Sequence, residues 1–434
     1  MRLLLTLFLI VVYCTRMHSF CIKITKIFFT VGNIQSIFSK YYFYIAVGDT
    51  PNFPGKNEKG RCIGIRGDEF VSRIMKQEIS LLQFILTITS IELGASILTL
   101  PADLAQEAGT DGWISIIMGY VLATVVGLCI IKVMSKHPEK TMQQILIFYF
   151  SPFLGKLIVV IWIIYAFLTA FSIFDASIYI INEWILPNTP NYLIAVLFIV
   201  PVYMALRDGV RLISRFQLVV FFLTIWLPLI LLFSLNNSHI MFLLPTLKEG
   251  WGPVIQGTRI SVFAFLGFEL AFLFYPYLKQ KQYAAKGIII ANSITLLIYL
   301  QITLICFVVF SPDEISKYIW PTLTLVKPIR FSFLERFEIV YVSFYILIFL
   351  TSVIPYVFFV TENISELFHR RSRSQLYIVL GFFLMSYMFY QPYFKDITFF
   401  NNVLSSISYF VAFAFPLFLW LYVMMVSKRK VISK

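Results

Sequence analysis

The sequence predicts an all-α polytopic membrane protein with ten transmembrane helices. Of its 434 residues, 59% are hydrophobic, 18% aromatic and only 13% charged, and the mean hydropathy is +0.84. A soluble domain is nearer about half apolar and about a quarter charged. From residue 79 onward, apolar runs alternate with short polar breaks. This pattern excludes an ordinary water-soluble enzyme, and it excludes disorder, which requires low hydrophobicity.

Ten apolar runs are candidates for membrane spans. A helix needs about 20 mostly apolar residues to cross the hydrocarbon core, and a helix satisfies all its backbone polar groups internally. The fourth and ninth runs are short. The predicted spans are 79–100, 113–134, 157–181, 192–206, 212–235, 254–275, 287–310, 337–360, 375–390 and 403–426.

Lysine and arginine predict the orientation of these spans. The loops after even-numbered spans are basic, as in the loop that carries Lys132, Lys136 and Lys140, whereas most alternate loops have few basic residues. The exception is the long segment 311–336, and long external loops tolerate charge. Both ends of the ten-span unit are therefore expected in the cytoplasm. The net charge of +13 is explained by this topology, and nucleic acid is not expected as a partner.

Residues 1–74 differ from the rest of the chain because they contain no clear spanning run. The apolar run 3–13 has the length of a signal-peptide core and is too short for a span. Two interpretations stay open. Translation could begin at Met75, just before the first span, or residues 1–74 could be a genuine cytoplasmic or interfacial extension. Residues 75–434 form the ten-helix membrane domain in either case.

No pattern in the sequence predicts an enzyme. The five cysteines have neither zinc-ribbon nor redox spacing, and the four histidines are far apart. Motifs of hydrolases, kinases and dinucleotide-binding enzymes are also missing from the sequence. We therefore expect no catalytic residues, no metal and no cofactor.

The first and sixth spans are interrupted near their middles. The first contains Glu92 and Gly94, and the sixth contains Gly267 and Glu269, with a proline further along each. Glycine and proline both favour a break, and a broken helix is tolerated at membrane depth only where it lines a protein or water cavity. Interrupted helices at matching places in two halves are typical of transporters. Because the halves hold five spans each, they insert with opposite orientation, as an inverted repeat requires.

At these residues the chain resembles known families. The string FAFLGFEL is similar to the sixth-helix motif of the amino acid–polyamine–organocation transporters, which have the LeuT-like fold. From Met75 to about residue 430 the chain resembles the B-type subunit of bacterial spore germinant receptors, the spore permease family. The matching strings, in order, are ISLLQF, ELGASILTLP, AGTDGWIS, HPEKT, NTP and RDGVRLISRFQ.

The resemblance implies a LeuT-like 5+5 inverted repeat and a multi-pass subunit of a nutrient receptor in the spore inner membrane. The nutrient would be an amino acid or a sugar-like molecule, and the partners would be an A-type membrane subunit and a C-type lipoprotein. The family does not usually carry a leader like residues 1–74. Two alternatives stay open: a proton-coupled amino acid permease, and a structural scaffold within the receptor.

The predicted ligand-binding residues lie at the two breaks. At the first, the N–H groups of Gly94, Ala95, Ser96 and Ile97 are expected to receive a carboxylate or hydroxyl. At the second, we expect Phe265, Gly267 and Phe268 to line the site and Glu269 to pair with an amine or hold a proton. Asp175 in the third span is a further candidate for the same cavity.

Each candidate has a structural alternative. The glycines could serve close helix packing, the phenylalanines could be ordinary core residues, and Glu269 could form a structural pair with backbone groups or with Arg259. Glu92 is expected to face water near the break.

Overall fold

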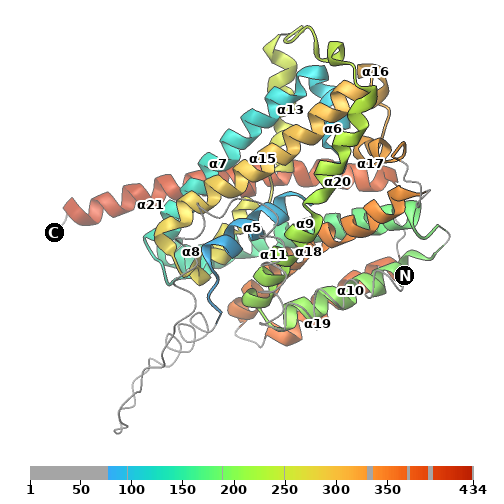
Figure 1. Cartoon of the computed structure of the whole chain (residues 1–434). Coiled ribbons are helices and arrows are strands. Elements are labelled where there is room, and N and C mark those ends of the chain that lie inside the picture. The colour runs from blue at the N-terminus through green and yellow to red at the C-terminus, as the bar shows by residue number, and fades with distance from the viewer. Residues whose placement is uncertain are drawn as a thin grey trace, which may run out of the picture. The chain divides into compact units, whose positions relative to one another are not determined.

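The computed structural model describes residues 77–432 with the exception of 95, 188, 249, 330–335, 369–371 and 390–393. The expectations for residues 1–74, including a start at Met75, lie outside these residues, as does Ala95. The regular structure of the described residues is helical, with one isolated parallel bridge between Ile79 and Leu278. Figure 1 shows the long helices packed side by side in a bundle.

The first five predicted spans all fall in helices. These helices, with the short ones that connect them, are α5 (Leu81–Glu92), α6 (Ser96–Ala108), η1 (Gly109–Asp111), α7 (Gly112–Ser135), α8 (Met142–Phe150), α9 (Pro152–Trp184), α10 (Asn191–Arg207), α11 (Val210–Thr224), α12 (Trp226–Ile230) and η2 (Leu231–Asn237).

The last five predicted spans also fall in helices. The second half comprises η3 (Ile240–Leu243), α13 (Trp251–Ala264), η4 (Phe268–Leu270), α14 (Ala271–Phe274), η5 (Tyr275–Tyr277), η6 (Lys281–Tyr283), α15 (Ala284–Val309), α16 (Pro312–Ile315), α17 (Pro321–Val326), α18 (Phe337–Phe368), α19 (Ser372–Phe389), α20 (Phe394–Ser408), the π-helical η7 (Tyr409–Ala414) and α21 (Phe415–Ile432).

Length and composition support several membrane crossings. Within the described residues, six continuous helical segments are long and apolar enough to cross a bilayer, and the bent pair Trp251–Ala264 and Phe268–Tyr277 is a seventh. Three further apolar helices are shorter: Leu81–Glu92, Asn191–Arg207 and Gln375–Tyr387. The chain is thus a multi-pass helical membrane protein, and the count of ten crossings stays a prediction.

Local sequence signals set the start of the first broken helix. Ser80 precedes α5, and its hydroxyl accepts from the Gln83 backbone N–H (3.2 Å) while the Gln83 side chain accepts from the Ser80 N–H (2.9 Å). This reciprocal capping box satisfies two donors that a helix start leaves unpaired. The first broken helix therefore starts at a defined residue.

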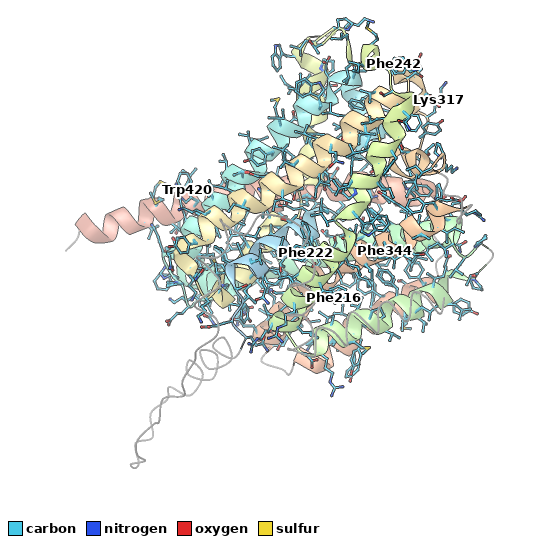
Figure 2. All side chains as sticks on the ribbon, viewed as in Figure 1. Phe216, Phe222, Phe242, Lys317, Phe344 and Trp420 are labelled. Atoms are coloured by element: carbon cyan, nitrogen blue, oxygen red, sulfur yellow. The ribbon has the colours of Figure 1, made fainter. Side chains whose placement is uncertain are left out.

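Helix α18 lies at the centre of the bundle. Nearly all of its apolar window is buried, and it packs against α9, α11 and α5. Side chains fill the spaces between the helices (Figure 2); on α11, Phe216 is buried whereas Phe222 is 40% exposed. Helix α9 also exposes an apolar stripe that includes Leu157, Ile161 and Ile164, the pattern of a lipid-facing side.

Candidate functional site

The first predicted break is present. Helix α5 ends at Glu92, a turn follows at Leu93 and Gly94, and α6 begins at Ser96. Gly94 lies so close to α18 that a Cβ atom there would come within 2.7 Å of the Ser352 hydroxyl. Glycine is therefore required at this position for the close approach of the break to α18.

Hydroxyl groups from neighbouring helices bind the carbonyls that the first break frees. The last carbonyls of a helix have no partner within it and must be satisfied by other groups. Hydroxyls of α15 and α18 donate to them: Tyr299 to the Glu92 carbonyl (2.5 Å), Tyr345 to the Gly94 carbonyl (2.6 Å) and Ser352 to the Ile91 carbonyl (3.0 Å). These three hydroxyls stabilise the unwound segment.

The second predicted break is also present. Helix α13 ends at Ala264, and the chain resumes as η4 at Phe268 with a bend of 43° between the two segments. Gly267 has φ +135°, a conformation that side chains with a Cβ rarely adopt. The backbone at this point can therefore turn only because the residue is glycine.

The two breaks contact each other directly. A Cβ atom on Gly267 would lie 2.9 Å from Ile91 Cγ2 and 3.0 Å from the Glu92 backbone nitrogen. The Tyr299 hydroxyl, which donates to the Glu92 carbonyl, also lies 3.0 Å from the Ala264 carbonyl. Residues almost two hundred positions apart thus form one contiguous unwound region at the centre of the bundle.

A second link joins the outer ends of the two broken helices. The Ile79 N–H donates to the Tyr277 carbonyl (2.9 Å), and the Lys279 N–H donates to the Ile79 carbonyl (3.1 Å). The beginning of the first broken helix and the end of the other are therefore bonded through their backbones.

Glu269 is fully buried and is bound by three donors. Its Oε1 accepts from Tyr356 (2.5 Å) and Tyr165 (3.0 Å), and its Oε2 accepts from the Gly267 N–H (2.7 Å). The suggested pairing with Arg259 is wrong, because that side chain is exposed on α13 and the carboxyl is already satisfied by neutral donors. Charge-assisted hydrogen bonds of this kind make burial of a carboxylate tolerable.

The expectation that Glu92 faces water is wrong, since only 1% of it is exposed. Thr295 donates to Oε2 (2.5 Å). The Asn292 amide, in the orientation that satisfies both of its atoms, donates to Oε1 (2.9 Å) and accepts from Thr124 (3.1 Å). Glu92 was not among the predicted binding residues, although an acid in the middle of an apolar run is by itself a functional candidate, and that signal could have found it.

Asp175 is buried in α9 but is not brought to the second break. Its carboxylate accepts from the Tyr387 hydroxyl of α19. Along α9 it is ten residues from Tyr165, which binds Glu269, and ten residues of helix span about 15 Å. The structure therefore separates Asp175 from the second break.

The two phenylalanines of the second break are core residues in this conformation. The Phe265 ring packs edge-on against Tyr299, with centroids 5.4 Å apart, and the Phe268 ring packs against Phe413 at 5.0 Å. Both are fully buried. Their packing matches the structural alternative named from the sequence.

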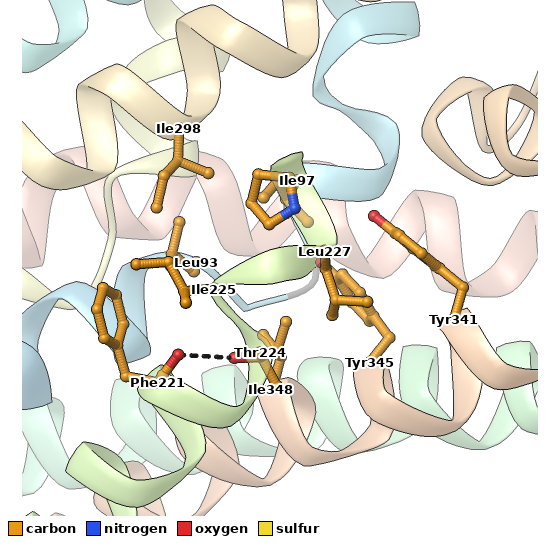
Figure 3. A pocket seen from close by; sticks show the side chains of 11 residues that line it. Leu93, Ile97, Phe221, Thr224, Ile225, Leu227, Ile298, Tyr341, Tyr345 and Ile348 are labelled. Atoms are coloured by element: carbon orange, nitrogen blue, oxygen red, sulfur yellow. Dashed lines mark hydrogen bonds between the residues drawn. The ribbon is translucent and has the colours of Figure 1, made fainter. Parts of the chain in front are cut away.

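A small pocket adjoins the first break (Figure 3). It lies between the break, α11, α12 and α18, and its cavity volume is about 20 Å³. Residues that line it include Leu93, Ile97, Phe221, Thr224, Tyr345 and Ile348. Of the predicted binding residues only Ile97 lines it.

A helical bundle with two broken helices that meet at its centre defines a protein of transporter-like fold. The crystal structure of MhsT in complex with L-phenylalanine is similar to this chain in fold: it matches with a TM-score of 0.58 over 76% of this chain and 86% of that chain, at 12% identity. The LeuT-like fold predicted from the sequence is thereby confirmed.

The chain belongs to the spore permease family of spore germination proteins, whose profile matches residues 78–393. Spore germination protein GerQB of Bacillus cereus is 25% identical over 312 residues, which are 70% of this chain and 84% of the relative. Spore germination protein YndE of Bacillus subtilis (strain 168) is 26% identical over 355 residues, 79% of this chain and 95% of the relative. The predicted family is confirmed.

Proposed function

We propose that this protein is the nutrient-sensing subunit of a spore germination receptor. It binds a small nutrient, such as an amino acid, at the helix breaks and passes the signal to an A-type membrane subunit and a C-type lipoprotein. The single observation that carries the proposal is the contact between Gly267 and Glu92, which joins the two breaks at the bundle centre. Membership of the spore permease family supports the role in germination.

The breaks supply the chemistry for binding. Helix α6 begins directly after the first break, so the N–H groups of its first turn have no partner within the helix and attract an anion. Here the unwound segments are held by hydroxyls and by each other. A nutrient that binds better to a separated pair of breaks shifts the population toward that conformation, and this shift is the signal.

The basic loops support an orientation with both ends of the ten-helix unit in the cytoplasm, and the family supports a place in the spore inner membrane.

A second candidate, a proton-coupled amino acid permease, is favoured by the two buried carboxyls. Gly267, whose N–H binds Glu269, packs against Glu92, so both carboxyls lie at the contact between the breaks, where either can carry a proton between two conformations.

Binding and uptake distinguish the two candidates. The full chain is purified and reconstituted, and binding of labelled amino acids, sugars and nucleosides is measured beside uptake driven by a pH gradient. The receptor predicts binding without uptake, lost in Gly267→Leu and Glu269→Gln. Uptake that depends on the gradient supports the permease, and assembly without any binding contradicts both.

Glycine 381 of α19 offers a matched control. A Cβ atom there would meet nothing within 4 Å, so Gly381→Leu should bind the nutrient as the unmodified protein does.

A further inference from the structure

The end of the bundle that we expect in the cytoplasm carries a group of lysines without acidic partners. Lys132 and Lys136 lie at the end of α7, and Lys140 follows in the loop to α8. We propose that these three lysines, together with Trp420 of α21, bind the head group of an anionic phospholipid. These four residues are called the basic seam below. The inference is independent of nutrient binding, because it concerns another ligand and another part of the protein.

Two of the lysines lie where α7 meets α21. Lys132 and Lys136 are four residues apart and therefore lie on the same side of α7, which packs against α21. The Lys132 Nζ lies 5.5 Å from the centre of the Trp420 ring, and the Lys136 Nζ lies 3.5 Å from the Val423 carbonyl oxygen. Both ammonium groups are thus held at the contact between the two helices.

The third lysine borders the same region. The Lys140 Nζ lies 4.2 Å from the centre of the Phe148 ring of α8. Helix α8 in turn packs on α21, because the Phe150 ring stacks on Tyr422 with centroids 4.9 Å apart. The three ammonium groups therefore surround one region formed by α7, α8 and α21.

The positive charge of the basic seam is not compensated by the protein. None of the three lysines forms an ion pair with a described residue. Glu139, the acid in the same loop, is exposed. The pKa of His137 is lowered by partial burial and then by the charges of Lys140 and Lys136, so their positive field acts on the loop itself. Clustered charge of one sign attracts an oppositely charged ligand.

The surface beside the basic seam favours a lipid over a soluble anion. On α21, Phe418, Leu421 and Met425 are exposed and lie on one stripe. They belong to the segment Phe399–Val426, the least buried of the six long apolar segments found in the described residues. Figure 2 shows Trp420 at the edge of the bundle, and tryptophan is typical of the membrane interface. A phospholipid can place its phosphate at the lysines and its acyl chains on this stripe.

The loop that carries the basic seam also holds the end of the central helix α18. Thr141 and Gln144 donate to the Glu366 Oε1 at 2.9 Å and 3.1 Å. Helix α18 supplies the Tyr345 and Ser352 hydroxyls that bind the first break. A lipid that orders this loop therefore stabilises the helix that holds the unwound segment, and anionic lipid should raise the thermal midpoint.

The test measures which lipid lies beside one labelled residue. Met424 of α21 is 39% exposed and follows Val423. In a full chain whose own cysteines are replaced by alanine, Met424→Cys is labelled with bimane. The protein is reconstituted in nanodiscs that hold equal amounts of phosphatidylglycerol and phosphatidylcholine, one of which carries a quenching spin label. Phosphatidylglycerol should quench more strongly, whereas a label at Ile164→Cys, on the exposed side of α9, should be quenched equally by both lipids.

Paired substitutions test the lysines. A lysine near an anionic membrane surface adds about fivefold to the affinity, so the unmodified seam should prefer phosphatidylglycerol at least about fivefold. The pair Lys132→Gln and Lys136→Gln should reduce this preference to nearly one, and the pair Lys132→Arg and Lys136→Arg should keep it. The control pair Lys279→Gln and Lys286→Gln removes two exposed lysines from another loop expected on the same side, and should leave the preference unchanged.

Thermal unfolding is a second measurement. The midpoint of the unmodified protein should be higher in phosphatidylglycerol than in phosphatidylcholine, and the pair Lys132→Gln and Lys136→Gln should lose this difference. Because the quenching result is a ratio of two lipids within one variant, a smaller amount of folded protein cannot imitate it.

Three outcomes overturn the inference. Equal quenching by both lipids at Met424 in the unmodified protein shows that no head group is selected. An equal loss of preference in the control pair shows that the whole basic side attracts lipid, rather than this seam. If inorganic phosphate raises the midpoint in phosphatidylcholine as much as phosphatidylglycerol does, the ligand is a soluble anion. None of these results bears on nutrient binding, so a failure here and a failure of the proposed function are distinguishable.

Discussion

Gly267 of the second break lies against Glu92 of the first, with a Cβ position 3.0 Å from the Glu92 backbone nitrogen. This contact leaves no room for a side chain and joins the two halves of the chain where each is unwound.

Gly267→Ala should lower the thermal midpoint and block germination. The substitution places a Cβ at φ +135° and against Ile91 and Glu92, and a residue in such a backbone region costs about 1–3 kcal/mol. Thermal unfolding of the detergent-purified protein measures the first effect, and spore germination measures the second. Gly381→Ala is the control, and an equal loss there would contradict the assignment.

Gly94→Ala should be rescued by a second substitution. The added Cβ would lie 2.7 Å from the Ser352 hydroxyl, so removing that oxygen in Ser352→Ala relieves the closest contact. We expect a coupling energy of about 0.5–3 kcal/mol, the range for residues in contact, so that Ser352→Ala costs less stability in the Gly94→Ala background than in the unmodified protein. Thermal midpoints of the four proteins complete the cycle, and strictly additive effects would show that the two positions do not interact.

Glu269→Leu should destabilise the protein more than Glu269→Gln. Leucine leaves the Tyr165 and Tyr356 hydroxyls without an acceptor, at about 1–3 kcal/mol for each, whereas glutamine keeps one oxygen for them. Thermal unfolding of both variants gives the order. Glu107→Gln, at an exposed position, should behave like the unmodified protein, and a reversed order of Leu and Gln would refute the hydrogen-bond account.

His137 should make the loop between α7 and α8 sensitive to acid. Partial burial, followed by the charges of Lys140 and Lys136, lowers the pKa of His137 below its ordinary value, and its Nε2 lies 3.0 Å from the Tyr149 hydroxyl. The unfolded loop therefore binds the proton more readily, so stability falls as pH drops through the ordinary histidine pKa of about 6.5.

The variant His137→Gln tests the direction of this pH dependence. Hydrogen exchange of the loop at pH 7.5 and at pH 5.5 should show greater opening at the lower pH in the unmodified protein and a smaller change in His137→Gln. Greater opening at the higher pH would contradict the prediction.

Much of the fold could be predicted from the sequence, because a segment that crosses lipid must be apolar and must satisfy its backbone polar groups internally. Hydropathy located the helices, and glycine beside an acid located both breaks, since Gly94 and Gly267 do lie where the chain unwinds. What a linear pattern lacks is the direction of a side chain about its helix. Glu92 was expected in water and is buried, and Asp175 was a candidate for the cavity at the breaks but is separated from the second one along α9 and contacts Tyr387.

The side chains that bind the freed carbonyls of the first break could not be predicted from the sequence either. Tyr299 and Tyr345 lie in long apolar helices that contain many aromatic residues, and nothing in their spacing distinguishes them from packing residues. Only the tertiary structure shows that their hydroxyls reach the first break.

The bridge between Ile79 and Leu278 bears on how the bundle can move. Both of its bonds are made by main-chain atoms, so ordinary replacements leave them intact, and only proline at 79 or at 279 would delete one of the two donors. The two discontinuous helices are thus tethered at the ends that lie away from the breaks, so a displacement of one requires a displacement of the other. We therefore expect the beginning of the first broken helix and the end of the second to move together, rather than one helix to bend alone.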